Sequence, residues 1–158
     1  GVIFVLNKWD TQEQGRTALK KAEENIRIMF GHMNYASVIA ISALEGKGMQ
    51  ELLNMALEMQ AQLHRKIDTG SLNLALKDWV SAYPPPASRT AHFKMRYMVQ
   101  TSSNPVSFLI FASRPEVVSD SYLAYIKNKI RSDLGFDKIP VLLELKASRK
   151  KWEDRERD

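Results

Sequence analysis

Cysteine is absent from the 158-residue sequence, which excludes disulfides, thiol nucleophiles and thiolate metal sites and fits a reducing, intracellular compartment. Long hydrophobic runs are also missing, since none approaches the roughly 18 residues of a membrane span. The histidines, His32, His64 and His92, form no H-x-x-x-H pair. We interpret them as surface or packing residues instead of metal ligands. We therefore expect a cytoplasmic protein with no membrane contact and no metal site.

Glycine is scarce, and the seven glycines are not spaced to bind phosphate. No segment fits G-x-x-x-x-G-K-[ST], in which backbone N–H groups surround phosphates and the Ser or Thr reaches Mg²⁺. A D-x-x-G segment, which senses a γ-phosphate, is missing as well. Gly46-Lys47-Gly48 resembles a phosphate loop in composition, but we interpret it as the flexible end of a loop before a helix. We expect no catalytic residue in this chain.

The most informative segment that is present is Asn7-Lys8-Trp9-Asp10, directly after the apolar residues 2–6. A carboxylate such as Asp10 only accepts hydrogen bonds and can take two at once. Guanine offers a matching pair of donors, N1–H and the exocyclic amino group, whereas adenine does not. Lys8 can lay its methylene stem along the base, and the Asn7 amide can hold the adjoining loop. The pattern predicts a guanine-binding loop, although N-K-x-D alone occurs by chance in many chains.

A second signal is Ser42-Ala43-Leu44, which follows the apolar residues 37–41. GTPases carry an S-A-[KL] loop here, in which a backbone N–H meets the guanine carbonyl and the Ser supports the Asp. Between the two loops, an apolar stripe of helical spacing predicts a helix: Leu19, Ala22, Ile26, Met29 and Met33. Both loops then lie at the carboxyl ends of strands, where open α/β sheets bind ligands. The alternative is an unrelated α/β fragment with a chance motif.

Residues 1–70 are therefore predicted to be the C-terminal half of a P-loop GTPase domain of the α/β class. Guanine would be contacted by Asn7, Lys8, Asp10, Ser42 and Ala43. We expect the phosphate-binding half to precede Gly1 in a longer parent protein. Mg²⁺ would then be bound only in the complete domain, through residues absent here.

The distribution of charge places a boundary near residue 70. Residues 1–70 contain 8 Lys+Arg against 8 Asp+Glu, whereas residues 71–158 contain 15 against 10. Before the boundary, an amphipathic helix is indicated by Met49, Leu52, Leu53, Ala56, Met59 and Leu63. After it, Ser71 is a candidate helix cap, and a second helical stripe runs until Pro84-Pro85-Pro86 ends the helix. Its members are Leu72, Ala75, Leu76, Trp79, Val80 and Tyr83.

Residues 71–147 continue with strand, strand, helix and strand. Alternation places Phe93, Met95, Tyr97 and Val99 on one face of the first strand. A turn at residues 102–105 leads to an antiparallel strand at 106–112, and a helix at 119–134 ends at Gly135. That helix has the inner stripe Leu123, Ile126, Ile130 and Leu134, and the last strand places Val141, Leu143 and Leu145 on one face. This order predicts an α+β domain with helices on one face of a three-stranded sheet. Residues 148–158 form a charged tail that we expect to be mobile.

Taken together, these motifs resemble the C-terminal part of the Der (EngA) family, bacterial proteins with two tandem GTPase domains and a KH-like domain. The resemblance covers the chain to about Lys146. Besides N-K-W-D and S-A-L-E-G-K-G, it is carried by Y-P-P-P at 83–86, K-M-R-Y at 94–97, Asn104-Pro105 and D-S-Y-L at 120–123. It implies GTP and GDP as ligands, a KH-like fold for residues 71–147, packing against the parent's own upstream GTPase domains and a role in assembling the large ribosomal subunit. The tail after Ala147 departs from the family's short ending.

The basic half has two interpretations. KH domains usually bind single-stranded nucleic acid through a G-x-x-G loop, and none exists here. Basic residues could still lie against ribosomal RNA phosphates; the candidates are Lys94, Arg96, Lys127, Lys129, Arg131, Arg149, Lys150 and Lys151. Alternatively they form a solvated face, since Lys127, Lys129 and Arg131 are off the apolar stripe. Trp152 could stack on a base or be incidental.

Two classes of function remain open. The chain is either a fragment of a GTPase or a non-enzymatic RNA- or protein-interaction module with a degenerate nucleotide site. A phosphate loop and a D-x-x-G upstream of Gly1 would establish the first class for the parent.

The isolated chain is expected to bind GTP weakly or undetectably, because most contacts to the nucleotide's phosphates and Mg²⁺ are missing. Nucleotide binding by calorimetry and phosphate release by the purified chain test this. Turnover above background would contradict the prediction.

Overall fold

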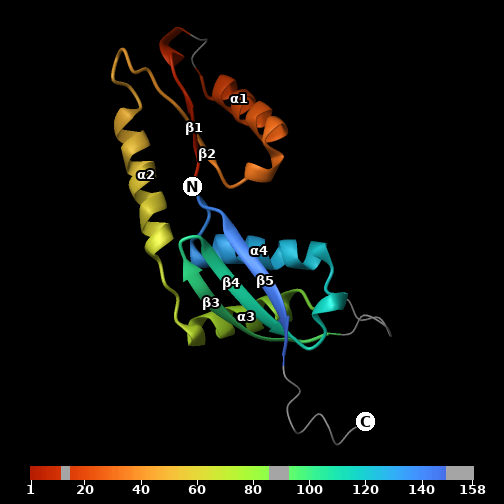
Figure 1. Ribbon diagram of the computed structural model, residues 1–158. Helices are drawn as coiled ribbons and strands as arrows, with labels where there is room; N and C mark the ends of the chain where they lie inside the picture. Colours follow the sequence, from red (N-terminus) through yellow and green to blue (C-terminus); the bar gives the residue numbers. More distant parts are fainter. Residues whose placement is uncertain (12–14, 86–92, 149–158) are drawn as a thin grey trace, which may run out of the picture. The chain divides into compact units, whose positions relative to one another are not determined.

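A computed structural model describes residues 1–11, 15–85 and 93–148 (Figure 1). The chain divides into two compact units. Unit 1 comprises residues 1–64 with 137–140, and unit 2 comprises residues 65–136 with the chain from Val141 onward. Of the charged tail predicted at 148–158, residues 149–158, including Trp152, lie outside the described residues, as do His92 and Pro86. No helix within the described ranges is long and apolar enough to cross a membrane.

Unit 1 is built on two parallel strands, β1 (Ile3–Leu6) and β2 (Ser37–Ala40), joined by helix α1 (Arg16–Met29). Short 3-10 turns, η1 (Trp9–Thr11) and η2 (Gly31–Met33), flank α1, and helix α2 (Met49–His64) follows β2. Leu6 pairs with Ala40 at the carboxyl ends of the strands. The loops that begin at Asn7 and Ile41 therefore leave the same edge of the sheet.

The apolar stripe of α1 is shorter than predicted. Leu19, Ala22 and Ile26 are half-buried, but Met29 is 73% exposed. The helix ends at Met29, so its period does not extend to Met33, which lies in η2. Phe30 takes the inner position instead, and its ring centroid lies 5.0 Å from that of Phe4.

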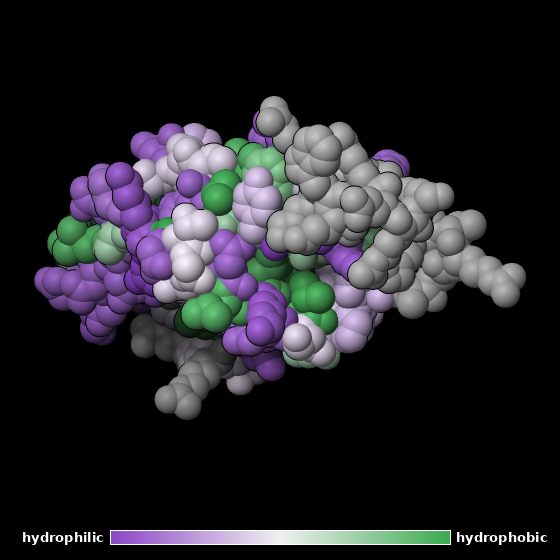
Figure 2. All heavy atoms as spheres, turned by 90° about the horizontal axis from the view of Figure 1, so that it is seen from below, coloured by the Kyte–Doolittle hydropathy of each residue, from purple (hydrophilic) through white to green (hydrophobic). Residues whose placement is uncertain are grey.

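The stripe predicted on α2 is also only partly buried. Met59 is buried, whereas Met49 and Leu53 are 38% and 56% exposed; Leu57, which the predicted stripe does not include, is 63% exposed. Single exposed apolar residues are ordinary, and the face of the molecule in Figure 2 also shows hydrophobic residues between hydrophilic ones. These three, however, recur every four residues and share one side of α2. Unit 1 therefore leaves an apolar helix face uncovered.

Unit 2 has the predicted order helix, strand, strand, helix, strand. Helix α3 (Thr69–Ala82) precedes β3 (Met95–Ser103) and β4 (Val106–Ala112); a 3-10 turn, η3 (Pro115–Val117), leads to α4 (Asp120–Leu134) and then β5 (Val141–Ala147). The sheet order is β3-β4-β5, with β3 antiparallel and β5 parallel to β4. The cis Asn104-Pro105 bond joins β3 to β4. Both helices lie behind this sheet in Figure 1, as expected for one covered face.

The helix-covered face of the sheet holds the main core. Residues of β4 alternate, so that Val106, Phe108, Ile110 and Ala112 are fully buried. Their partners on the same face include Met98 of β3 and Val141 of β5. The buried residues contributed from outside the sheet are Leu72, Leu76, Trp79, Phe93, Tyr122, Ile126, Ile130 and Phe136.

Strand β3 departs from the predicted alternation. Its register shifts between Met95 and Tyr97, so two residues of β3 oppose one of β4. Met95 pairs with Ala112 on the covered face, whereas Tyr97 pairs with Phe111 and Val99 with Leu109 on the opposite face. The prediction that Met95, Tyr97 and Val99 share one face is therefore wrong, because a β-bulge exchanges the faces after Met95. We call the face that bears Tyr97 the open sheet face.

Two helix details also differ from the prediction. The cap of α3 is Asp68, whose carboxylate accepts a hydrogen bond from Ser71 N at 2.9 Å, and Ser71 is inside the helix. In α4, Tyr122 takes the innermost position predicted for Leu123; Tyr122 is 1% exposed and Leu123 is half-buried. A buried tyrosine needs a partner for its hydroxyl, and Tyr122 Oη donates to the carbonyl of Tyr83 at 3.0 Å. Gly135 ends α4 as predicted, at φ 72°.

The outer edge of β3 is partly covered by a side chain. The Asn73 amide of α3 accepts from Met98 N at 2.9 Å and donates to Met98 O at 3.2 Å. It thereby occupies both backbone groups that a foreign strand would pair with at this position.

Replacing Tyr122 by Phe should lower the free energy of unfolding of unit 2 by about 0.5–1.5 kcal/mol, because the buried contact to the Tyr83 carbonyl is lost. Urea unfolding followed by far-UV circular dichroism measures this. The control is Tyr83→Phe, at a ring that is 56% exposed, which should change stability by less than about 0.5 kcal/mol.

The same pair of variants tests a pH effect. Burial raises the pKa of Tyr122 to about 12, above its ordinary value of 10.0. The unfolded chain then releases this proton first, so stability should fall as pH rises from about 10 to about 12. An equal loss in Tyr122→Phe would show that other groups cause it.

Candidate functional site

The loop after β1 is fixed by the side chain of Asn7. Its Oδ1 accepts from Lys8 N at 2.8 Å and from Ala43 N at 3.2 Å, so one amide oxygen joins loops 36 residues apart in sequence. Lys8 has φ 61°, in the left-handed region, which costs a non-glycine residue roughly 1–2 kcal/mol. The hydrogen bond to Asn7 offsets this strain. Lys8 O also accepts from Thr11 N and Thr11 Oγ1, at 3.1 and 2.8 Å.

The loop after β2 is a tight turn. Ser42 N donates to Lys47 O at 3.0 Å, and Ser42 Oγ accepts from Glu45 N at 3.2 Å. Ser42 is 2% exposed, so its hydroxyl supports the turn from inside. Two glycines at positive φ complete it, Gly46 at 70° and Gly48 at 77°. A Cβ on Gly48 would lie 2.6 Å from Ala40 O, whereas one on Gly46 would meet nothing within 4 Å.

The two loops line an open cavity of about 610 Å³. Its lining residues are Asn7, Lys8, Asp10, Thr11, Ala43 and Leu44. The structure thus brings together four of the five residues predicted to contact guanine, and Ser42 lies buried behind them. Thr11 and Leu44 were not assigned a contact from the sequence, although Thr11 directly follows N-K-W-D and Leu44 belongs to S-A-L. A volume of this size suits a small-molecule ligand, and Asp10 supplies the acceptor oxygens that a guanine would need.

Lys47 belongs to this turn and not to a phosphate loop. Its Nζ lies 2.7 Å from Glu45 Oε2 in an exposed ion pair. The hydrogen bond to Glu45 raises the pKa of Lys47 above its ordinary value, and the Asp10 carboxylate adds to the effect. The interpretation of Gly46-Lys47-Gly48 as the end of a loop before a helix is consistent with this geometry.

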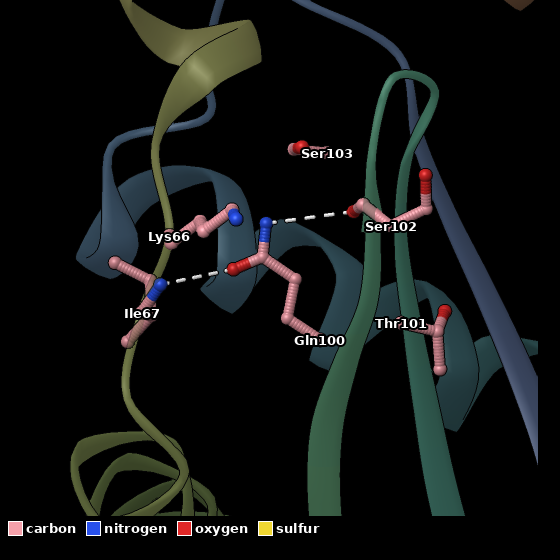
Figure 3. Close-up of a pocket in the computed structure, with 6 residues that line it drawn as sticks. All are labelled: Lys66, Ile67, Gln100, Thr101, Ser102 and Ser103. Atoms are coloured by element: carbon pink, nitrogen blue, oxygen red, sulfur yellow. Dashed lines mark hydrogen bonds between the residues drawn. The ribbon is translucent and has the colours of Figure 1, made fainter.

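Unit 2 has a separate polar cavity of about 360 Å³, lined by Lys66, Ile67, Gln100, Thr101, Ser102 and Ser103. Figure 3 shows the Gln100 side chain directed at the chain before α3. Gln100 Oε1 accepts from Ile67 N at 2.9 Å, and Nε2 donates to Arg65 O at 2.9 Å. Gln100 therefore fixes the start of unit 2 to β3.

The candidate RNA-facing residues fall into two groups. Lys94 and Arg96 are exposed, on and beside β3. Lys127, Lys129 and Arg131 of α4 are half-buried, so they do not form the fully solvated face of the alternative interpretation. Lys129 forms an ion pair with Asp133 at 3.3 Å, and burial, together with the charge of Arg131, lowers the pKa of Lys127. The candidates Arg149, Lys150 and Lys151 lie outside the described residues. Across the described ranges, no cluster of three or more His, Asp or Glu could hold a metal ion.

Comparison with known proteins identifies the class. Residues 66–146, just over half of the chain, match the family model described as the KH-domain-like C-terminal domain of EngA bacterial GTPase enzymes. The chain therefore belongs to the EngA family and corresponds to the C-terminal part of Der.

Individual relatives extend the match to nearly the whole chain. It is 42% identical to "GTPase Der" of Treponema pallidum over 151 residues, which cover 96% of this chain and 33% of the relative. It is 35% identical to "GTPase Der" of Thermomicrobium roseum, over 97% of this chain and 34% of the relative. The match to "GTPase Der" of Chloroflexus aggregans is also 35%, with the same two shares. The chain thus spans about a third of the length of these relatives.

The tightness of the second loop can be tested with the two glycines. Gly46→Ala should lower the local opening free energy by about 1 kcal/mol, from strain at positive φ alone. Gly48→Ala should lower it by more than about 2 kcal/mol, because the new Cβ also meets the Ala40 carbonyl. Hydrogen exchange at the amides of Ser42 and Ala43 reports the difference. Equal exchange in the two variants would show that the close approach at Gly48 has no energetic weight.

Proposed function

We propose that residues 1–64 are the guanine-reading half of a GTPase domain in a longer parent protein. The observation that carries this proposal is the Asn7 side chain, which holds the N-K-W-D and S-A-L loops together around one cavity. Asp10 would accept the two donors of guanine, and the Lys8 stem would lie along the base. Ala43 would present its backbone to the base, and Ser42 would hold the turn in place.

The uncovered face of α2 supports the view that this unit is part of a larger domain. Met49, Leu53 and Leu57 form an exposed apolar stripe, and such a surface marks a contact site when it is contiguous. The rest of the GTPase domain would cover it and would supply the phosphate loop and the Mg²⁺ site. This chain's own residues would bind and orient the base, and GTP or GDP would be the ligand of the complete domain.

We further propose that unit 2 docks the parent on the maturing large ribosomal subunit, in the cytoplasm, through ribosomal RNA. Residues 71–158 carry the whole positive excess of the chain, and neutralisation of RNA phosphates by Lys and Arg favours such contacts. The exposed Lys94 and Arg96 fit this role better than the half-buried residues of α4. A protein-docking role for unit 2 is the competing function.

The base-reading role is tested by Asp10→Asn in the complete parent. The substitution replaces one acceptor with a donor, so the pairing with guanine's amino group is lost, while xanthine, with a carbonyl there, becomes the better match. A mispaired polar group costs roughly 1–3 kcal/mol, and GTP affinity should fall about tenfold to a hundredfold while XTP affinity rises. Competition binding with GTP and XTP measures both. If the variant still prefers GTP to the same degree, Asp10 is not the base reader.

A further inference from the structure

The open sheet face of unit 2 carries an aromatic pair that the core does not use. Tyr97 of β3 and Phe111 of β4 are register partners, with ring centroids 4.3 Å apart and planes at 17°. Tyr97 remains 42% exposed although Phe111 stacks on it. An aromatic side chain held in one orientation and left partly exposed is the feature on which single-stranded nucleic acids stack their bases.

Two lysines lie at the same end of this face. Lys146 of β5 is the register partner of Phe111, so Tyr97, Phe111 and Lys146 form one row across the three strands. Lys94 exchanges hydrogen bonds with Ser113, one position beyond the Met95–Ala112 pair, and strand alternation therefore places it on the open face. Both lysines are exposed, and in the described part of the chain neither takes part in an ion pair.

The other end of the face differs in character. The next row contains Val99, Leu109 and Glu144, and beyond it Leu142 is 46% exposed. The positive charge is therefore gathered around the aromatic pair, with one carboxylate a row away. A strand of RNA fits this arrangement when a base stacks on Tyr97 and its phosphates lie toward the lysines. An apolar protein segment would offer no negatively charged partner to the ammonium group of either lysine.

We propose that the open sheet face is a stacking platform for single-stranded RNA, with Tyr97 as the base-stacking ring and Lys94 and Lys146 as phosphate contacts. This inference deepens the proposed docking of unit 2 on RNA and rests on it. Because every base has a π face, binding is tolerant of sequence and dependent on salt.

The test measures binding of the 158-residue chain to a fluorescein-labelled single-stranded RNA of about ten nucleotides, within the usual site sizes, by fluorescence anisotropy over a range of salt concentrations. Tyr97→Ala should weaken binding about 5- to 150-fold, the range for loss of one stacked base. Tyr97→Phe keeps the ring and should bind as the original chain does. Tyr97→Leu keeps the apolar bulk without the ring and should behave like the alanine variant. Far-UV circular dichroism and thermal unfolding establish that each variant is folded.

Two charge variants and one apolar variant of the open sheet face distinguish an RNA platform from a protein-docking face. Lys146→Gln should reduce the slope of log affinity against log salt by about 0.7, one single-strand phosphate contact. Glu144→Gln removes the neighbouring carboxylate and should tighten binding, whereas Leu142→Ala should leave it unchanged.

The outcomes distinguish the inference from the broader proposal. If the original chain binds RNA and folded Tyr97→Ala and Tyr97→Leu bind equally well, the platform is overturned and RNA docks elsewhere on unit 2. If the original chain does not bind RNA at low salt, both proposals fail. Loss of RNA affinity in Leu142→Ala equal to that in Tyr97→Ala would instead indicate a general apolar docking face.

Discussion

One amide oxygen links the two loops of the candidate nucleotide site. Asn7 Oδ1 accepts one hydrogen bond from Lys8 N in its own loop and one from Ala43 N in the loop after β2. Without it, Lys8 would lose one of the hydrogen bonds that offset its left-handed backbone, and Ala43 N would lose its partner in the loop after β1. The parallel pairing of β1 with β2 brings the loops to one edge, a backbone hydrogen bond from Trp9 N to Ile41 O at 3.0 Å joins them, and Asn7 Oδ1 adds the side-chain contact that holds Ala43 at the cavity. An aspartate could accept the same bonds, but it would add a second negative charge beside Asp10.

The two units differ in how completely they bury their apolar residues. Unit 2 closes a core between two helices and one face of a three-stranded sheet, with many side chains fully buried. Unit 1 has only a two-stranded sheet, and among its described residues Ile41, Met59 and Ile139 alone are buried hydrophobics. Small units bury a lower fraction of their surface. The same deficit explains the exposed stripe on α2, and it is consistent with a unit whose remaining strands and helices belong to another part of the parent.

Element order was predictable from the sequence because it depends on strong local signals. Both apolar runs before N-K-W-D and S-A-L form strands, and Gly135 ends α4 at a positive φ. The errors arose where a tertiary contact overrode the local pattern. Tyr122 replaced Leu123 in the core because the Tyr83 carbonyl accepts from its hydroxyl, and no period in the sequence reports that partner. Likewise, Ser71 and Asp68 are both good caps, and only the backbone path of residues 68–71 decides between them.

The β-bulge after Met95 connects an error of prediction to the surface that it creates. A regular strand would keep Tyr97 on the same face as Met95, where the register partners are buried core residues. One extra residue in β3 exchanges the faces, so Met98 enters the core and Tyr97 moves outward to stack on Phe111. Bulges are used elsewhere to re-aim a side chain near a functional site. In this position Tyr97 stabilises the sheet only through its cross-strand pair with Phe111, which contributes roughly 0.2–1 kcal/mol, and its exposed ring lies on the same face as Lys94 and Lys146, as the proposed stacking platform requires.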